Sequence, residues 1–203
     1  MASITSDAPT VRYATEDGRT FSQLAVGLPT ADSVFIRPQD VPTILALIKE
    51  LAEYERASSS VLATEDSLRS TLSFPSKPSS GYAKTLLIFP PASSTPNQCA
   101  GMALYFNNYS TWRAGPGIYL EDLFIRPEFR GKGYGKRLFG ELALEGKRIG
   151  GHRLEWSVLK WNEPSIKFYE ALGASKMEEW MQMRVDTDAG LSKIGEWGVG
   201  VKG

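Results

Sequence analysis

Three glycines lie among the six residues 130–135, and this segment limits how the surrounding chain can fold. The apolar residues 117–126 before it predict a strand, and the residues after it predict a helix that ends near position 149. Glycines between a strand and a helix let backbone N–H groups come close to an anion, and the start of the helix adds positive partial charge. The segment therefore predicts a phosphate-binding turn, with a purely structural turn as the alternative.

Two common nucleotide-binding motifs do not fit these glycines. A nucleoside-triphosphate loop would need glycine at position 130 and a hydroxyl group at position 137, and both positions hold arginine. The dinucleotide motif G-x-G-x-x-G lacks its third glycine whichever glycine it starts from. The segment is therefore a candidate pyrophosphate site of another kind.

The scarce residue types argue against several other classes of chemistry. A single cysteine, Cys99, cannot form a disulfide within the chain, and a single histidine, His152, leaves no imidazole cluster for zinc. Lys+Arg and Asp+Glu both number 23, so no net positive charge attracts nucleic acid or an anionic membrane. No apolar run approaches the ~20 residues of a membrane span, and the N-terminus lacks a signal-peptide pattern. We expect a cytoplasmic protein, with a nuclear location as an alternative, that binds no metal, nucleic acid or membrane.

Apolar residues recur at helical spacing between positions 40 and 55. Asp40 can cap this helix, and its apolar face contains Ile44, Leu47, Ile48 and Leu51. The same face continues to Tyr54 and Glu55. Because an unpaired carboxylate is costly to bury, there are two alternatives for Glu55. Either the helix reaches solvent at this position, or Glu55 faces a cleft that binds a cation.

Two acids interrupt the apolar strand that leads to the glycine-rich turn. Glu121 and Asp122 are neighbours, and neighbouring residues of a strand point to opposite faces. In a covered sheet at least one of the two carboxylates needs a partner. Either such a carboxylate forms a salt bridge with an arginine, or it faces an open cleft beside reacting atoms.

A third segment, residues 161–174, predicts a short helix that Gly173 ends. Phe168 belongs to the core by its spacing. Tyr169 shares that face, and its hydroxyl needs a partner if it is buried. Packing in the core is the alternative role for Tyr169.

The order of the expected elements indicates one domain of mixed α/β class with an extension at each end. The domain is expected at residues 34–186, after an N-terminal extension at 1–33 with a candidate hairpin (11–15 and 19–24) and before a flexible tail at 187–203. Strands are expected at 34–37, 84–89, 100–106, 117–126 and 153–159, with β structure, in two short strands, at 174–185. Helices are expected at 40–55, from 64, at 135–149 and at 164–172.

In this order, the glycine-rich turn, the acidic strand and the last helix resemble the GCN5-related N-acetyltransferase superfamily. The turn matches its acetyl-CoA motif, Arg/Gln-x-x-Gly-x-Gly/Ala, as Arg130, Gly133 and Gly135. A closer resemblance, to diamine (spermidine/spermine) acetyltransferases and their thialysine- or ornithine-acetylating relatives, rests on LIKELAEYE at 47–55, YLEDLF at 119–124 and WNEPSIKFY at 161–169. The resemblance implies a twisted, mostly antiparallel central sheet flanked by helices, with acetyl-CoA in a cleft between central strands.

The resemblance also implies a reaction, the direct transfer of the acetyl group of acetyl-CoA to a primary amine. An alkylammonium with a pKa near 10 must lose a proton before it attacks, and by analogy with the family Glu121 accepts that proton. Tyr169 stands where the family's general acid protonates the departing CoA thiolate. The residues implied to bind acetyl-CoA are Leu123, Phe124, Ile125, Arg130, Gly131, Lys132, Gly133, Tyr134, Gly135, Lys136, Asn162 and Ser165.

The residues implied to bind the amine are Tyr54, Glu55, Trp112, Asp122 and Trp180. Ser110 stands where polyamine acetyltransferases tend to carry aspartate, which favours shorter amines or basic amino acids such as thialysine and ornithine over long polyamines. Relatives form homodimers, so a homodimer is expected.

Two other functions stay open at this point. A protein (histone) lysine acetyltransferase would need an open groove, whereas the acidic residues Glu55, Glu121 and Asp122 favour a small cation. A non-catalytic acyl-CoA sensor would need neither a base nor an acid, and the presence of both Glu121 and Tyr169 argues against it.

Overall fold

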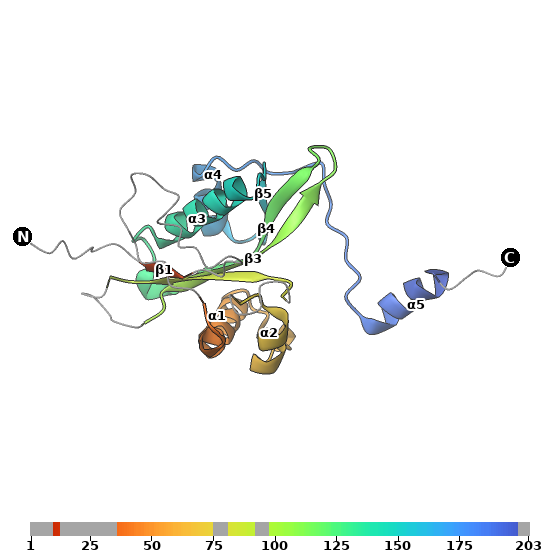
Figure 1. Cartoon of the computed structure of the whole chain (residues 1–203), viewed down its shortest axis with the longest axis horizontal. Coiled ribbons are helices and arrows are strands. Elements are labelled where there is room, and N and C mark those ends of the chain that lie inside the picture. Colours follow the sequence, from red (N-terminus) through yellow and green to blue (C-terminus); the bar gives the residue numbers. More distant parts are fainter. Residues whose placement is uncertain (1–9, 13–35, 75–80, 92–97, 199–203) are drawn as a thin grey trace, which may run out of the picture. The chain divides into compact units, whose positions relative to one another are not determined.

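A five-stranded sheet lies at the centre of the first part of the chain (Figure 1). The structure, a computed structural model, describes residues 10–12, 36–74, 81–91 and 98–198. The strands follow the order β1-β2-β3-β4-β5, all antiparallel except the parallel pair β4–β5. Their bounds are Thr10–Arg12, Lys84–Phe89, Gly101–Ser110, Gly115–Ile125 and Leu154–Trp156. The expected mostly antiparallel sheet is confirmed, and β5 is shorter than the strand expected at 153–159.

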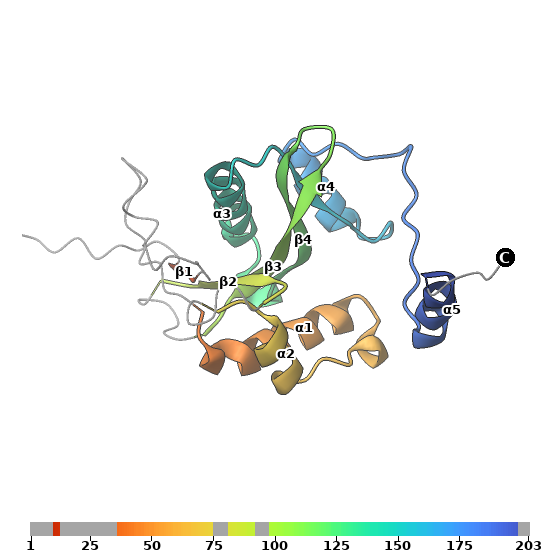
Figure 2. The ribbon, with the colours of Figure 1, turned by 45° about the vertical axis from the view of Figure 1, so that its right-hand side comes forward.

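Helices lie on both sides of this sheet (Figures 1 and 2). Helices α1 (Val41–Tyr54) and α2 (Glu65–Thr71) are on one side, and α3 (Tyr134–Arg148) is on the other. None of the described helices combines the length and the apolar character that a membrane crossing requires. The mixed α/β class with flanking helices is therefore confirmed.

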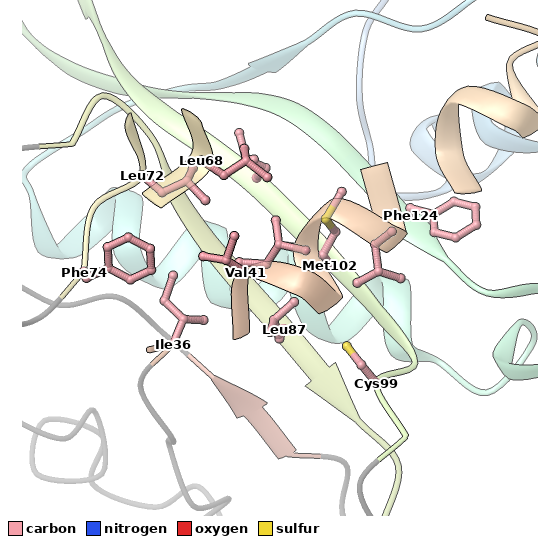
Figure 3. Close-up of a cluster of buried hydrophobic side chains, with 12 residues drawn as sticks. Ile36, Val41, Leu68, Leu72, Phe74, Leu87, Cys99, Met102 and Phe124 are labelled. Carbon is pink, nitrogen blue, oxygen red and sulfur yellow. The ribbon is translucent and has the colours of Figure 1, made fainter. Parts of the chain in front are cut away.

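The apolar face of α1 packs on the sheet as its spacing predicts. Ile44 and Leu47 are fully buried in the core cluster, and Ile48 and Leu51 pack against it. On the sheet side, the cluster holds Leu87, Met102 and Phe124, which are register partners in β2, β3 and β4 and so point to the same face (Figure 3). This packing fixes α1, with Tyr54 and Glu55 at its end, against the strand that carries the two acids.

Two expectations at the N-terminal side are wrong. Ile36 and Arg37 are not in a strand, and residues 34 and 35 lie outside the described residues. The edge strand beside β2 is instead Thr10–Arg12, so the candidate hairpin contributes a strand that pairs with β2, and the rest of that hairpin lies outside the described residues. Asp40 does stand at the start of α1, but its carboxylate accepts the N–H of Arg37 at 2.7 Å and does not cap the helix, because it closes the preceding 3-10 turn.

The chain divides into two compact units, residues 1–157 and 158–203. The second unit contains α4 (Glu163–Ala171) and α5 (Asp188–Gly198). Gly173, with φ 87°, follows α4 as expected for the residue after a helix end. The domain bounds expected at 33/34 and 186/187 stay predictions.

The two short strands expected at 174–185 are absent from the structure, which assigns no strand to these residues. Their alternating pattern, with Met181, Met183 and Val185 exposed, is typical of a strand. A strand also needs a partner for its backbone groups, however, and the described residues of this unit offer none. The tail contains a helix, α5, where a flexible segment was expected.

Candidate functional site

The glycine-rich turn joins β4 to α3 and has the backbone geometry that its sequence predicts. Gly131 and Gly133 have φ angles of 76° and 81°, in the left-handed region that favours glycine. A Cβ atom built on either residue would meet no other heavy atom within 4 Å. Glycine is therefore needed there for backbone conformation, and the space beside both residues is open.

The start of α3 directly follows this turn. Gly133 is the residue that precedes the helix, and no side chain caps it. The first four N–H groups of a helix have no partner within the helix, and they form the positive end of its dipole. Here these N–H groups belong to Gly133 and the residues that follow it, which are expected from the sequence to bind the pyrophosphate of acetyl-CoA. The turn and the helix start together can bind an anion.

The strand before the turn has an open edge. β5 pairs with β4 only at Ile118–Leu120, and among the described residues no other strand pairs with this edge of β4 beyond Leu120. Leu123 and Ile125 are half-buried, and the ring of Phe124 is buried in the core cluster. The backbone of this segment can therefore form hydrogen bonds with an extended ligand along the edge.

A β-bulge lies at the two acids. Asp122 is paired with Leu104 and Leu120 with Tyr105, so Glu121 is an extra residue in β4. Glu121 is exposed, while Asp122 is half-buried. Because of the bulge, the directions of the two carboxylates do not follow the regular alternation of a strand.

Glu55, Glu121 and Asp122 form an acid cluster. Burial is the main cause that raises the pKa of Asp122 to about 6, and the negative charges of Glu121 and Glu55 raise it further. Burial also raises the pKa of Glu55, which ends α1 and is half-buried. This proximity to Asp122 favours the interpretation that Glu55 faces a cation site. An ammonium group would relieve the repulsion among these carboxylates.

Arg130 connects the turn to the end of α1. Its Nε–H donates to the carbonyl of Ile125 at 2.9 Å. Its Cζ lies 5.1 Å from the ring centroid of Tyr54 and 5.9 Å from that of Phe124. Beside it in the turn, Lys132 places its Nζ 5.2 Å from the ring centroid of Phe129.

Trp112 does not lie beside the acid cluster of its own chain. It is 90% exposed in the turn between β3 and β4. Gly115, where β4 begins, and Glu121 are six residues apart, which is about 20 Å along a strand. Ser110 is buried at the end of β3, where it pairs with Gly115.

The remaining expected site residues belong to the second unit. The side chain of Asn162 caps α4 and accepts the N–H of Ser165 at 3.3 Å. The Tyr169 ring lies 5.4 Å from that of Phe168, centroid to centroid. Trp180 is 68% exposed in the segment between α4 and α5. The catalytic or binding roles of these residues stay predictions.

An ion pair that the sequence did not indicate ties α1 to β4. The guanidinium of Arg126 binds Glu50 twice, with Nη2–Oε1 at 2.6 Å and Nε–Oε2 at 2.8 Å. Its Nη1 also donates to the carbonyl of Cys99 at 2.9 Å. No pattern predicts such a pair, because its partners lie on elements distant in sequence. It fixes α1 one turn before Tyr54.

Comparisons with known proteins identify the family and the fold. The model of the Acetyltransferase (GNAT) family matches residues 48–174. The L-ornithine N5-acetyltransferase NATA1 of Arabidopsis thaliana is 33% identical over an aligned length of 203 residues, and the alignment covers 79% of this chain and 89% of that protein. The thialysine N-epsilon-acetyltransferase of Bos taurus is 35% identical over 153 residues, 74% of this chain and 89% of that protein. Among solved structures, the integron cassette protein VCH_CASS6 of V. cholerae has the same fold, with a TM-score of 0.62, 24% identity, and 79% and 94% of the two chains covered.

Proposed function

The chain belongs to the acetyltransferase (GNAT) family and is an N-acetyltransferase, and we propose that its acceptor is the primary amine of a small cationic metabolite. The observation that carries this proposal is the acid cluster of Glu55, Glu121 and Asp122, in which the pKa of Asp122 is raised to about 6. Burial is the main cause of this shift and repulsion by Glu121 and Glu55 adds to it, and an ammonium group bound there would offset both effects.

The turn and the open edge of β4 fit acetyl-CoA. We assign the pyrophosphate to the N–H groups at the start of α3, where open space lies beside Gly131 and Gly133. The backbone of residues 123–125 supplies hydrogen bonds to the pantetheine arm and polarises the thioester carbonyl. When bound, acetyl-CoA supplies the activated acetyl group, and the protein supplies orientation and proton transfer.

Glu121 is the proton acceptor in this proposal. It lies at the bulge, exposed, where it can take a proton from the ammonium through water before the amine attacks the thioester. Tyr54, Glu55 and Asp122 bind the rest of the cationic substrate. Carboxylates 121 and 122 thus have different tasks, which their different burial supports.

Tyr169 is the proposed general acid. A phenol has an ordinary pKa near 10 and can protonate an alkyl thiolate as CoA departs. In the same proposal, Asn162 and Ser165 help to orient the cofactor. Proton transfer by a carboxylate and a phenol completes this step without a metal ion.

The substrate class is supported by the names of the similar proteins, which are an ornithine and a thialysine acetyltransferase. Both amines are short and carry further charged groups. By the resemblance, Ser110 stands where polyamine acetyltransferases tend to carry aspartate, which favours a shorter amine. We therefore propose a diamine or basic amino acid, such as ornithine or thialysine, as the acceptor.

We further propose that the protein is a homodimer of the cytoplasm, with the nucleus as the alternative location. Exposed apolar side chains support association: Met177, Trp180, Met181, Met183, Leu191, Ile194 and Trp197 in the second unit, and Trp112 in the β3–β4 turn. In a dimer, Trp112 and Trp180 can serve as walls or as cation–π contacts for the amine. Sedimentation velocity at micromolar concentration should give twice the mass of the chain.

The function is tested by measuring the release of CoA thiol from acetyl-CoA in the presence of single amines. The set contains spermidine, spermine, putrescine, ornithine, lysine, thialysine, glucosamine and a histone-tail peptide. The proposal predicts saturable turnover with at least one small cationic amine, and a loss of that turnover in the Glu121→Gln variant. Turnover with the peptide alone would favour a protein lysine acetyltransferase. Tight acetyl-CoA binding without turnover on any amine would favour an acyl-CoA sensor.

A further inference from the structure

Arg130 opens the acetyl-CoA motif, yet its guanidinium lies against two aromatic rings from other elements. The Tyr54 ring comes from the end of α1, and the Phe124 ring comes from β4. Both centroids lie within the ~6 Å at which a guanidinium and an aromatic face attract each other. Arg130, a residue of the expected cofactor site, therefore contacts Tyr54, a residue of the expected amine site.

Several contacts limit the rotamers of this long side chain. The hydrogen bond from Nε to the carbonyl of Ile125 fixes one edge of the guanidinium. Tyr54 is the last residue of α1, so the cation also lies near the end of a helix, where the dipole favours positive charge. An arginine held in one position loses less freedom when it binds a phosphate group.

We infer that Tyr54 is a positioning residue for acetyl-CoA: its ring holds the guanidinium of Arg130 at the glycine-rich turn, and this contact couples the cofactor site to the amine site. The inference rests on the proposed function, because it takes the turn as the pyrophosphate site. Coupling between two sites is reciprocal, so CoA should change the affinity for the amine by the same factor by which the amine changes the affinity for CoA.

The experiment measures CoA binding by calorimetry without any amine, in the wild type and in Tyr54 variants. Tyr54→Leu removes the aromatic face, and we expect CoA to bind about two- to fivefold more weakly, the range for a partly exposed cation–π contact. Tyr54→Phe keeps the face and should match the wild type. Glu53→Gln is the control for the neighbouring position, because Glu53 is exposed and has no role in the proposed sites.

A double-mutant cycle separates this role from a general loss of packing. In an Arg130→Met background, Tyr54→Leu should have no further effect on CoA affinity, because the guanidinium that the ring holds is already absent. An equal loss in both backgrounds, or no loss in the wild-type background, would overturn the inference. If the wild type itself does not bind CoA, the proposed function fails as well. If the wild type binds CoA and only the Tyr54 effect is missing, the inference alone fails.

Discussion

Glu55 at the end of α1 and Asp122 in β4 are far apart in the sequence, yet the charge of Glu55 helps to raise the pKa of Asp122. Burial contributes most to this shift, followed by the charge of Glu121. All three causes oppose the ionisation of Asp122, which brings its pKa to about 6. A cation bound among these carboxylates would reverse the penalty. The ionised acid cluster is thus destabilised in the free protein, and binding of an ammonium ligand would stabilise it.

The first prediction concerns stability and pH. The pKa of Asp122 is about 6 in the folded chain against an ordinary 3.8, so the folded chain holds this proton more tightly than the unfolded chain. The stability that the protonated carboxyl contributes is therefore fully present below pH 4, and it is lost as the pH rises through 6 and the carboxyl ionises. Two pKa units correspond to ~3 kcal/mol as an upper limit. Asp122→Asn should therefore raise the free energy of unfolding at pH 7 and leave it nearly unchanged at pH 4. Urea denaturation at both pH values checks this, and an equal effect at both would contradict it.

A second prediction concerns amine binding by Glu55. If this carboxylate binds a cation, Glu55→Gln should raise the KM for the amine by about tenfold, the order of one lost hydrogen bond between charged groups, with a smaller change in kcat. Steady-state kinetics at saturating acetyl-CoA measure both constants. Glu53→Gln, on an exposed position of the same helix, is the matched control. A fall in kcat as large as the rise in KM would instead place Glu55 in the chemical step.

The third prediction concerns the general acid. Tyr169→Phe removes one hydroxyl and should lower kcat by about 10²- to 10⁴-fold, while the affinity for acetyl-CoA stays the same. Rapid-quench kinetics and calorimetry separate the two effects. Tyr82→Phe is the control, because Tyr82 is 84% exposed and has no role in the proposal. Unchanged turnover in Tyr169→Phe would remove the acid role from this residue.

The fourth prediction concerns the turn. Gly133 has φ 81° and open space around it, so Gly133→Ala should cost about 1–2 kcal/mol through backbone strain alone and should weaken CoA binding. Gly140→Ala within α3 also places a Cβ in open space, but in a helix, and should stabilise the protein by up to ~1 kcal/mol. Thermal unfolding and CoA calorimetry of both variants measure the difference. The interpretation fails if the two variants behave alike.

The fifth prediction concerns the ion pair between α1 and β4. Glu50→Gln removes the negative charge that Arg126 binds, and should lower the free energy of unfolding by about 1 kcal/mol, since both side chains are partly exposed. Because the pair fixes α1 one turn before Tyr54, the KM for the amine should also rise. Glu53→Gln should change neither quantity. Chemical denaturation and amine kinetics give the two readouts.

Local patterns predicted the elements that position the site. Helical spacing identified the buried face of α1 through Ile44 and Leu47, and the glycines at 131 and 133 identified the turn. The same spacing gave the two alternatives for Glu55, solvent or a cation site, since a carboxylate is costly to bury unpaired, and the cation site stays a prediction. Each of these features depends on neighbours within a few residues, so the sequence contains the information.

Other features depend on partners that are distant in sequence. The bulge at Glu121 results from the register between β3 and β4, and no pattern within β4 marks it. The edge strand beside β2 comes from Thr10–Arg12, whereas Ile36 and Arg37, the described part of another expected strand, are in none, because pairing with β2 decides the outcome. Residues 174–185 have an alternating pattern without a strand, for the same reason.

Competition between amines shows whether the acceptor is a small cationic amine. The wild-type protein receives limiting acetyl-CoA and an equimolar mixture of ornithine, thialysine, putrescine and a lysine-containing histone-tail peptide, and mass spectrometry quantifies each acetylated product. The product ratios give the relative kcat/KM values. We expect the product of one small amine to exceed the acetylated peptide by at least about tenfold, the order of one lost hydrogen bond between charged groups. An acetylated peptide as the main product would contradict it.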